Sequence, residues 1–178
     1  MYLKMSLKEI ITVPNEMLKK TSEPIEKVGV NERKLIGDLF DTMYHSNGIG
    51  LAAVQVGILK RVLVIDVSSK DEPKKPMSFI NPVIKSVSQD TSIYEEGCLS
   101  IPDTFIEIER PKTCEVEYID LNAKKKILKC DGLLSTCLQH EINHLDGKLI
   151  IDHLSKLKRD LIIKKISKSR KNPDRIVV

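Results

Sequence analysis

The sequence contains His140-Glu-Ile-Asn-His144, two histidines four positions apart in a segment that is expected to form one helix. Asp131-Gly132 marks a turn whose Asp131 caps the helix, and Gly147 ends it. Positions four residues apart share one face of a helix, so both imidazoles can bind one cation. Glu141 stands beside the first histidine and can take or give a proton at a water on that cation. The motif therefore favours a metal-binding helix at the centre of the fold; the alternative is a helix with two surface histidines and a solvated glutamate.

The remaining patterns predict an α+β fold with its strands in the middle of the chain. Apolar residues recur at helical spacing from Asn31, taken as a capping residue, to about Ser46. A basic amphipathic helix is predicted over 153–171, followed by a tail over 172–178. Strands are expected at 61–67, at 77–87 with a break at Pro82, and at 114–121. This order favours mixed or antiparallel sheets around the central helix, with one helix before them and one after, and not repeating strand–helix–strand units.

Length and composition indicate one globular domain over residues 1–178. The chain is 41% hydrophobic and 30% charged, close to the average of soluble domains. The sequence has no apolar run of about 18 residues and no signal-peptide pattern, so we expect neither a membrane span nor export. The four cysteines have no CxxC spacing and are expected to be reduced, which favours bacterial cytoplasm or an organelle matrix.

The positive charge is concentrated at the C-terminal end of the chain. Residues 156–178 hold nine Lys or Arg against Asp160 and Asp174, although the whole chain carries a net charge of only +4. A basic tail on a slightly acidic body indicates a local docking surface, and it argues against sequence-specific nucleic-acid binding by the whole domain. The alternative is a docked helix whose basic face is simply solvated.

A catalytic metal site needs a third protein ligand besides the two histidines. Cys98 lies in Glu95-Glu-Gly-Cys-Leu-Ser-Ile-Pro102, where a preceding glycine lets the backbone come close to a metal. Its alternative role is that of a buried structural cysteine. The other candidate ligands follow the motif in the chain: they are Asp146, Asp152 and His153.

Three segments together resemble the signature motifs of peptide deformylases. They are GIGLAAVQ at 48–55, EGCLS at 96–100 and QHEINHLDG at 139–147, in the order and spacing of that family. The resemblance extends from about residue 9 to 165. It implies a metal-dependent hydrolase that removes the formyl group from the N-terminal formylmethionine of newly made polypeptides and releases formate.

The resemblance also implies the parts of the site. Cys98, His140 and His144 would hold one divalent ion, which in the family is usually Fe²⁺, with Zn²⁺, Ni²⁺ or Co²⁺ as substitutes. Glu141 would be the general acid and base. The side-chain amide of Gln55 and the backbone N–H of Leu99 would donate to the oxyanion of the tetrahedral intermediate.

We expect the substrate to lie against the same helix. Leu133, Thr136 and Cys137 share the face of His140 and should line a pocket for the methionine side chain, although core packing is an equal alternative for Leu133. The other expected pocket residues are Ile49 and Tyr94, with Gly50 and Gly97 letting the substrate backbone come close.

Two further expectations concern the surroundings of the Cys98 segment. Glu96 and Arg110 should form a buried ion pair that braces this segment. Some relatives carry an arginine where this chain has Asp103-Thr104-Phe105, so the rim of the pocket should be less basic and more apolar.

The expected partners are formylmethionyl nascent peptides and, through the basic C-terminal helix, the ribosome, with no membrane. Two other functions fit some of the pattern: a metalloprotease or amidase built on the same motif, and an inactive ribosome-associated module. The intact Glu141, Gln55 and Cys98 argue against the second, and a cysteine as third ligand argues against the first.

Overall fold

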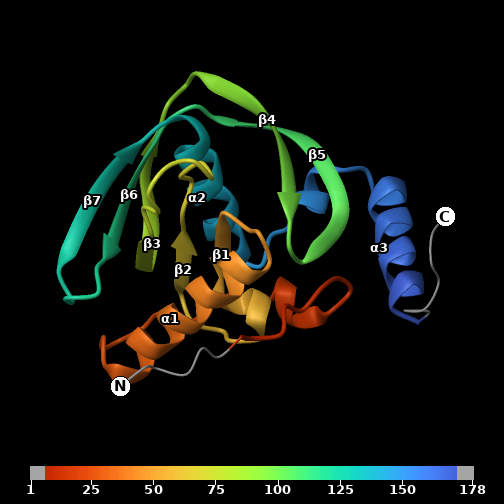
Figure 1. Cartoon of the computed structure of the whole chain (residues 1–178). Helices are drawn as coiled ribbons and strands as arrows, with labels where there is room; N and C mark the ends of the chain where they lie inside the picture. Colours follow the sequence, from red (N-terminus) through yellow and green to blue (C-terminus); the bar gives the residue numbers. More distant parts are fainter. Residues whose placement is uncertain (1–6, 172–178) are drawn as a thin grey trace.

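Most strands of the computed structural model, which describes residues 7–171, belong to one five-stranded sheet (Figure 1). Its strands, in spatial order, are β1 (Gly50–Ala52), β2 (Val62–Ile65), β3 (Met77–Val87), β6 (Cys114–Ile119) and β7 (Lys125–Cys130). A separate hairpin consists of β4 (Thr91–Cys98) and β5 (Ile101–Pro111). All pairs of these strands are antiparallel. The expected α+β class with antiparallel sheets is thus confirmed.

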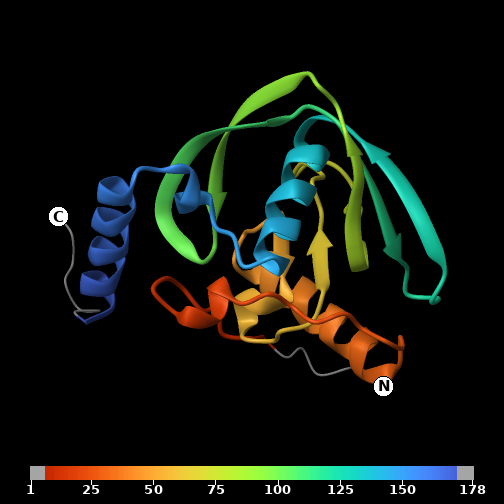
Figure 2. The same cartoon turned by 180° about the vertical axis from the view of Figure 1, so that it is seen from behind.

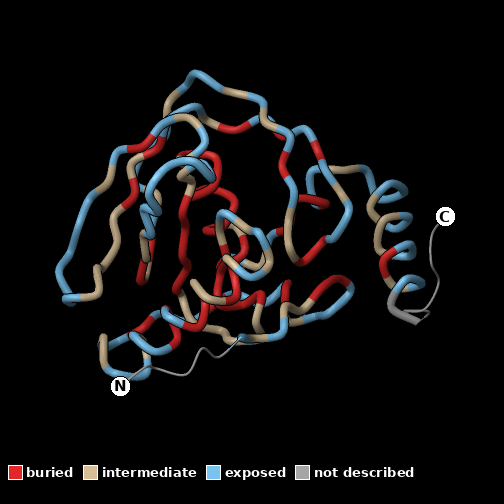
Figure 3. The backbone as a smooth tube through the Cα atoms, viewed as in Figure 1, coloured by how far each residue is buried: buried red, intermediate tan, exposed pale blue. Residues whose placement is uncertain are grey.

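Three α-helices surround or enter this framework: α1 (Val30–His45), α2 (Gly132–Leu145) and α3 (Lys156–Lys171). Short 3₁₀ turns η1 (Glu16–Lys19), η2 (Ala53–Val56) and η3 (Ile150–His153) join the elements. Both views place α2 in the middle, between the five-stranded sheet and the β4–β5 hairpin (Figures 1 and 2). Ten of the 14 residues of α2 are buried, as a helix enclosed on all sides requires (Figure 3). No helix within residues 7–171 is long and apolar enough to cross a membrane.

The sheet is covered on both faces, and β2 shows this most clearly. Leu63 and Ile65 pack with Leu138 of α2, whereas Val62 and Val64 pack with Leu39 of α1. Successive side chains of a strand point to opposite faces, so a strand covered on both sides is apolar throughout. This is why 61–67 could be recognised as a strand from its continuous β-branched run.

The start of α1 and the course of β3 differ from expectation. The N-cap of α1 is Gly29 and not Asn31, because the carboxylate of Glu32 accepts the backbone N–H of Gly29 at 3.0 Å.

The predicted break at Pro82 is also wrong. β3 continues through this residue with a shift of register between Ile80 and Val83, because a bulge accommodates a residue that cannot donate to the ladder.

The C-terminal helix is shorter than predicted, and four strands were not predicted. His153 ends η3, and α3 begins only at Lys156, so 153–155 are not part of it. The predicted tail at 172–178 lies outside the described residues. The unpredicted strands are β1, β4, β5 and β7. β5 carries two prolines and a residue at φ 54°, and β7 is an edge strand with few buried residues.

Candidate metal centre

The two histidines of the motif lie side by side on the buried face of α2. The Nε2 atoms of His140 and His144 are 3.2 Å apart, and both side chains are buried. The spacing of four residues produces this arrangement because one turn of helix brings the two rings to the same side.

Cys98 completes the group from the end of β4. Its Sγ atom lies 3.2 Å from Nε2 of His144, and the three donor atoms lie within 4.8 Å of one another. The register shift between Gly97 and Cys98 places this residue at the end of the paired hairpin. Within residues 7–171, these are the only three His, Cys, Asp or Glu side chains grouped in this way. Separations of 3.2 Å fit ligands that are each about 2.0–2.3 Å from one ion, so the cluster fits a divalent metal.

The alternative ligands have other partners. Asp146 accepts a hydrogen bond from Arg61 at 2.8 Å. Asp152 accepts the backbone N–H of Leu149 at 2.8 Å, and His153 ends η3 outside the cluster. Cys98 is therefore the only one of the four candidates that the fold brings to the histidines.

The expected ion pair between Glu96 and Arg110 is confirmed, and it extends to the metal centre. Arg110 donates to Glu96 through Nε at 2.5 Å and Nη2 at 3.0 Å, and through Nη1 to Asn143 at 2.8 Å. The second oxygen of Glu96 lies 2.8 Å from Nδ1 of His140. Burial alone would raise the pKa of Glu96, but His140 and Arg110 outweigh it and lower the pKa. The carboxylate thus orients the imidazole and leaves Nε2 of His140 facing the cluster.

The two histidines differ in proton affinity. Burial alone would lower the pKa of His140, but the neighbouring Cys98 sulfur and Glu96 carboxylate raise it to about 10. Burial and the charge of His140 lower the pKa of His144 well below its ordinary value. Negative charge is therefore concentrated around His140, which also favours a cation in the cluster.

Glu141 lies at the edge of the cluster and is buried. One of its oxygens is 4.0 Å from Nε2 of His140, and the other has no hydrogen-bond partner among the described residues. Burial, together with the nearby charge of Glu96, raises the pKa of Glu141 to about 7 against the opposing effect of His140. A carboxyl group with this pKa can both accept and return a proton near neutral pH.

Gln55 is buried beside the cysteine rather than at the surface. Its Nε2 donates to Ser100 Oγ at 3.1 Å and points to Cys98 Sγ at 3.7 Å. Its Oε1 accepts the backbone N–H of Ala52 at 2.9 Å. These contacts fix the orientation of the amide, so its N–H groups face the metal centre.

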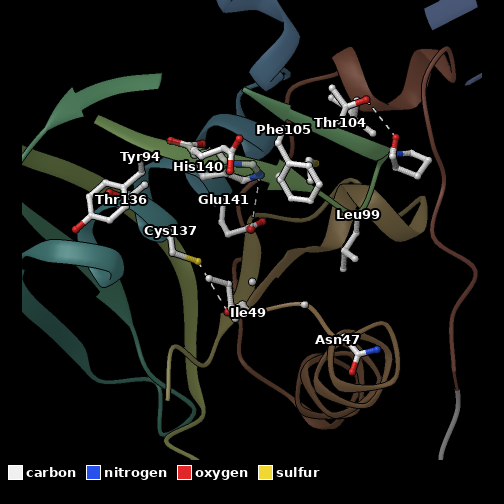
Figure 4. A pocket seen from close by; sticks show the side chains of 18 of the residues that line it. Asn47, Ile49, Tyr94, Leu99, Thr104, Phe105, Thr136, Cys137, His140 and Glu141 are labelled. Carbon is white, nitrogen blue, oxygen red and sulfur yellow. Dashed lines mark hydrogen bonds and ion pairs between the residues drawn. The ribbon is translucent and has the colours of Figure 1, made fainter. Parts of the chain in front are cut away.

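A cavity of about 490 Å³ is lined by two residues of the cluster, Cys98 and His140; His140 is labelled in Figure 4. All the predicted substrate-site residues line it: Ile49, Gly50, Tyr94, Gly97, Leu133, Thr136 and Cys137. Leu133 is 44% exposed, so it lines the cavity and is not a core residue. Leu99, Gln55, Cys98, His140 and Glu141 line it as well, which places the expected catalytic groups at one wall. His144 lies beneath them, buried.

The two glycines are required by close contacts. A Cβ atom on Gly50 would lie 2.5 Å from a carboxylate oxygen of Glu141. A Cβ atom on Gly97 would lie 2.8 Å from the ring of Phe105. Any side chain at position 50 would therefore displace Glu141.

The rim contains the expected Asp103, Thr104 and Phe105, and also Asn47, which sequence reasoning did not assign to the pocket. Phe105 is 68% exposed and lines the cavity from the β4–β5 hairpin (Figure 4). Asp103 and Thr104 of the same hairpin line it as well. Asn47 lines the opposite side, next to the predicted GIGLAAVQ segment. The residues that line the cavity include no Lys or Arg. The rim is thus without a basic side chain among the described residues, and its difference from relatives stays a prediction.

Comparison with known proteins gives a consistent result. The family model described as "Polypeptide deformylase" matches residues 7–160. The peptide deformylase of Pelagibacter ubique is 58% identical over 174 residues, covering 98% of this chain and all of that protein. The crystal structure of peptide deformylase from Ehrlichia chaffeensis superposes with a TM-score of 0.90 at 43% identity, covering 94% of this chain and 99% of that one. A structure of the Ehrlichia protein in complex with actinonin has a TM-score of 0.88 at 44% identity, covering 97% of this chain and 100% of that one.

Proposed function

Because this chain belongs to the polypeptide deformylase family, which hydrolyses the formyl group from the N-terminal formylmethionine of new polypeptides, we propose that its Cys98–His140–His144 cluster is the metal site of that reaction. The observation that carries this assignment is the position of the cluster at one wall of the cavity, beside a buried glutamate. A divalent ion held there supplies Lewis-acid chemistry and lowers the pKa of a water molecule.

Glu141 is proposed as the group that moves the proton. Its buried carboxyl group lines the cavity, and its pKa is raised to about 7. It takes a proton from the attacking water and returns it to the amine that leaves when the C–N bond of the formamide breaks. Gly50 leaves room for the carboxyl group on the side of β1.

Gln55 and Leu99 are proposed to stabilise the negative charge that develops on the formyl oxygen. Nε2 of Gln55 is held beside Cys98 by its bonds to Ser100 and Ala52. Leu99 follows the proposed thiolate ligand in the turn between β4 and β5. Donors that are positioned before the reaction need no reorganisation during it, and removing one typically costs about 2.7–4 kcal/mol.

The methionine side chain is proposed to enter the apolar part of the cavity. Leu133 and Ile49 are half-exposed there, and Cys137 and Tyr94 are nearby. The peptide that follows would run along β1, which is an edge strand of the five-stranded sheet with unpaired backbone groups on its outer side. This arrangement puts the formyl group at the metal wall.

Formate release tests the proposal. Protein reconstituted with Ni²⁺ should release formate from formyl-Met-Ala and no acetate from acetyl-Met-Ala. Glu141→Gln should abolish the reaction while retaining the metal. Glu107→Gln, an exposed change on β5 outside the cavity, is the matched control and should leave the rate unchanged. Full activity of the Glu141 variant would refute the proposed role of this residue.

The two other functions have less support. A metalloprotease should cleave internal peptide bonds, so the same protein should be assayed with an unblocked peptide that contains several apolar residues. An inactive ribosome-associated module would show no formate release from folded, metal-loaded protein. The family match and a cysteine as third ligand favour the deformylase over the metalloprotease, and the presence of Glu141, Gln55 and Cys98 at the cavity favours it over the inactive module.

The resident ion is proposed to be Fe²⁺. A thiolate with two imidazoles suits iron and zinc equally well, so the choice depends on the family resemblance and not on the ligands. Protein purified without oxygen should contain iron, and its activity should fall on exposure to air or peroxide as the iron or Cys98 is oxidised. Full activity of an iron-loaded sample after long aerobic storage would contradict this.

The basic helix α3 is proposed to bind the ribosome. The proposed location is the bacterial cytoplasm, because the relative from Pelagibacter ubique is a bacterial protein and bacterial nascent chains are made there. Ile166 anchors α3 to the hairpin, while Leu157 and Leu161 are exposed beside basic side chains. A triple change to Glu at Lys164, Lys165 and Lys168 should reduce co-sedimentation with ribosomes in low salt. The control is the same change on β7, at Lys125, Lys126 and Lys129. Equal co-sedimentation of both variants would refute the proposal.

A further inference from the structure

A second pair of cysteines lies away from the cavity, on the outer strands of the five-stranded sheet. Cys114 begins β6 and Cys130 ends β7, and the two residues are directly opposite in the antiparallel register. Their sulfur atoms are 3.3 Å apart, and both are free thiols. Opposed residues of an antiparallel pair have Cα atoms about 4.5–5.5 Å apart, and disulfides span about 4.4–6.8 Å. The backbone therefore already has the separation that an S–S bond requires.

The two sulfur atoms have different surroundings. Ser135, in the first turns of α2, donates its hydroxyl to Cys114 Sγ at 3.4 Å. The thiol of Cys130 donates to the backbone carbonyl of Cys114 at 3.4 Å and lies against its sulfur. Hydrogen bonds from Cys130 and Ser135 lower the pKa of Cys114, against burial, whereas the contact with Cys114 and burial raise that of Cys130. Cys114 is thus the more readily ionised sulfur of the pair.

A small molecule can reach this pair from outside. Both side chains are buried, but a cavity of about 510 Å³ lies against them at the end of the sheet. Ser88, Thr113 and Lys129 also line it. Lys129 is paired with Glu115 at 3.4 Å, and Asp131 also lines the cavity, so the cavity supplies access and not a net positive charge. This cavity shares no lining residue with the one at the metal centre.

We propose that Cys114 and Cys130 are a modification site at which a hydroperoxide forms an intramolecular disulfide, independent of the metal centre. The Cys114 thiolate attacks one peroxide oxygen, the O–O bond breaks, and the released hydroxide takes a proton to give water. Cys130 then attacks the resulting sulfenic acid, the S–S bond forms, the S–O bond breaks, and a second water leaves with the Cys130 proton. Two thiols and one hydrogen peroxide become one disulfide and two waters, so sulfur is oxidised and peroxide oxygen is reduced.

The site is suited to a reversible modification. A sulfenic acid with a resolving thiol in contact is converted to the disulfide before it oxidises further. Ser135 also accepts a hydrogen bond from Gln139 at 3.0 Å, the residue before His140. Ser135 therefore connects Cys114 by hydrogen bonds to Gln139, in the turn of α2 that carries His140. The two sulfur atoms of the pair remain outside the catalytic cavity.

Peptide mapping of the nickel-loaded wild-type protein tests this inference. After equimolar hydrogen peroxide, free thiols are alkylated and the protein is digested with trypsin without a reductant. We expect peptide 113–124 to be linked to peptide 130–148, with fragment ions placing the bond at Cys130 and not at Cys137, and with the link lost on adding dithiothreitol. Cys137→Ser should retain the link. A link through Cys137 or Cys98, or two intact thiols at 114 and 130, would overturn the proposal.

Single variants test which sulfur reacts first. In Cys130→Ser, peroxide should leave a sulfenic acid on Cys114 that dimedone labels. In Cys114→Ser, Cys130 should be labelled at least tenfold less. Equal labelling of the two would overturn the assignment of Cys114 as the attacking thiolate, and the wild-type map remains decisive if either variant fails to fold.

Discussion

Replacing Arg110 with Met should destabilise the protein by about 3–5 kcal/mol, the usual cost of removing one member of a buried ion pair. Arg110 is 6% exposed and Glu96 is 7% exposed, so water cannot replace the lost guanidinium. The change removes two hydrogen bonds to Glu96 and one to Asn143. It leaves a buried carboxylate whose only remaining side-chain partner within residues 7–171 is His140.

The partner substitution separates the stability of the pair from its effect on the metal. Glu96→Gln keeps an oxygen that can accept from Nδ1 of His140 but removes the charge, so metal affinity should fall about 10–100-fold. The double variant, with Glu96→Gln and Arg110→Met, has no uncompensated buried charge. It should therefore be more stable than the sum of the single effects predicts, by about 0.5–3 kcal/mol.

Urea unfolding of metal-stripped protein measures these differences, because bound metal would add its own stabilisation. The matched control is Arg159→Met, which breaks an ion pair with Asp152 at 3.2 Å in which both side chains are exposed to solvent. That change should cost less than about 1 kcal/mol. If Arg110→Met costs no more than Arg159→Met, the buried pair does not brace the metal centre and the reasoning fails.

Three other predictions concern the catalytic groups and the buried thiols. Gly50→Ala should lower kcat/KM by about 100-fold with little change in stability, because the Cβ of the alanine would displace the carboxylate of Glu141. Kinetics equal to those of the wild type would show that Glu141 tolerates this displacement. Gln55→Met should lower kcat about 10²–10³-fold with KM nearly unchanged, measured by formate release, and a change in KM alone would argue for a binding role. Thiol alkylation of the native protein should depend on pH, because the pKa of Cys114 is lowered and burial raises the pKa of Cys137. Cys114 should therefore form its thiolate and react at a lower pH than Cys137. Mass spectrometry of the alkylated protein measures this order, and the reverse order would contradict the prediction.

Several parts of the site follow from short stretches of sequence. The α2 helix and the common face of its two histidines follow from a period of 3.6 residues, which involves only neighbours in the chain. The continuous apolar run of β2 likewise indicates burial on both faces. The structure confirms both, and it confirms that Leu133, Thr136 and Cys137 line the cavity as the face of the helix predicts.

Other parts depend on which segments pair. From the residues alone, Cys98 was one of several candidate ligands, and only the resemblance to a family singled it out. The structure brings it to His144 because the β4–β5 hairpin lies against α2, across a sequence separation of 46 residues. The role of Phe105 at the rim and the absence of a break at Pro82 also depend on strand pairing, which local propensities do not determine.

The sequence by itself determined the helix that carries the histidines, the buried central strand and the set of residue types for metal-assisted hydrolysis, because periodicity and motif spacing are local. Only the tertiary structure decided that Cys98 joins the histidines, that Arg110 is buried with Glu96, and that Cys114 faces Cys130. The last contact depends on the register of β6 with β7, a strand that sequence patterns did not predict. Such contacts form when distant segments bury their surfaces together, and the free energy of that burial is a property of the whole fold.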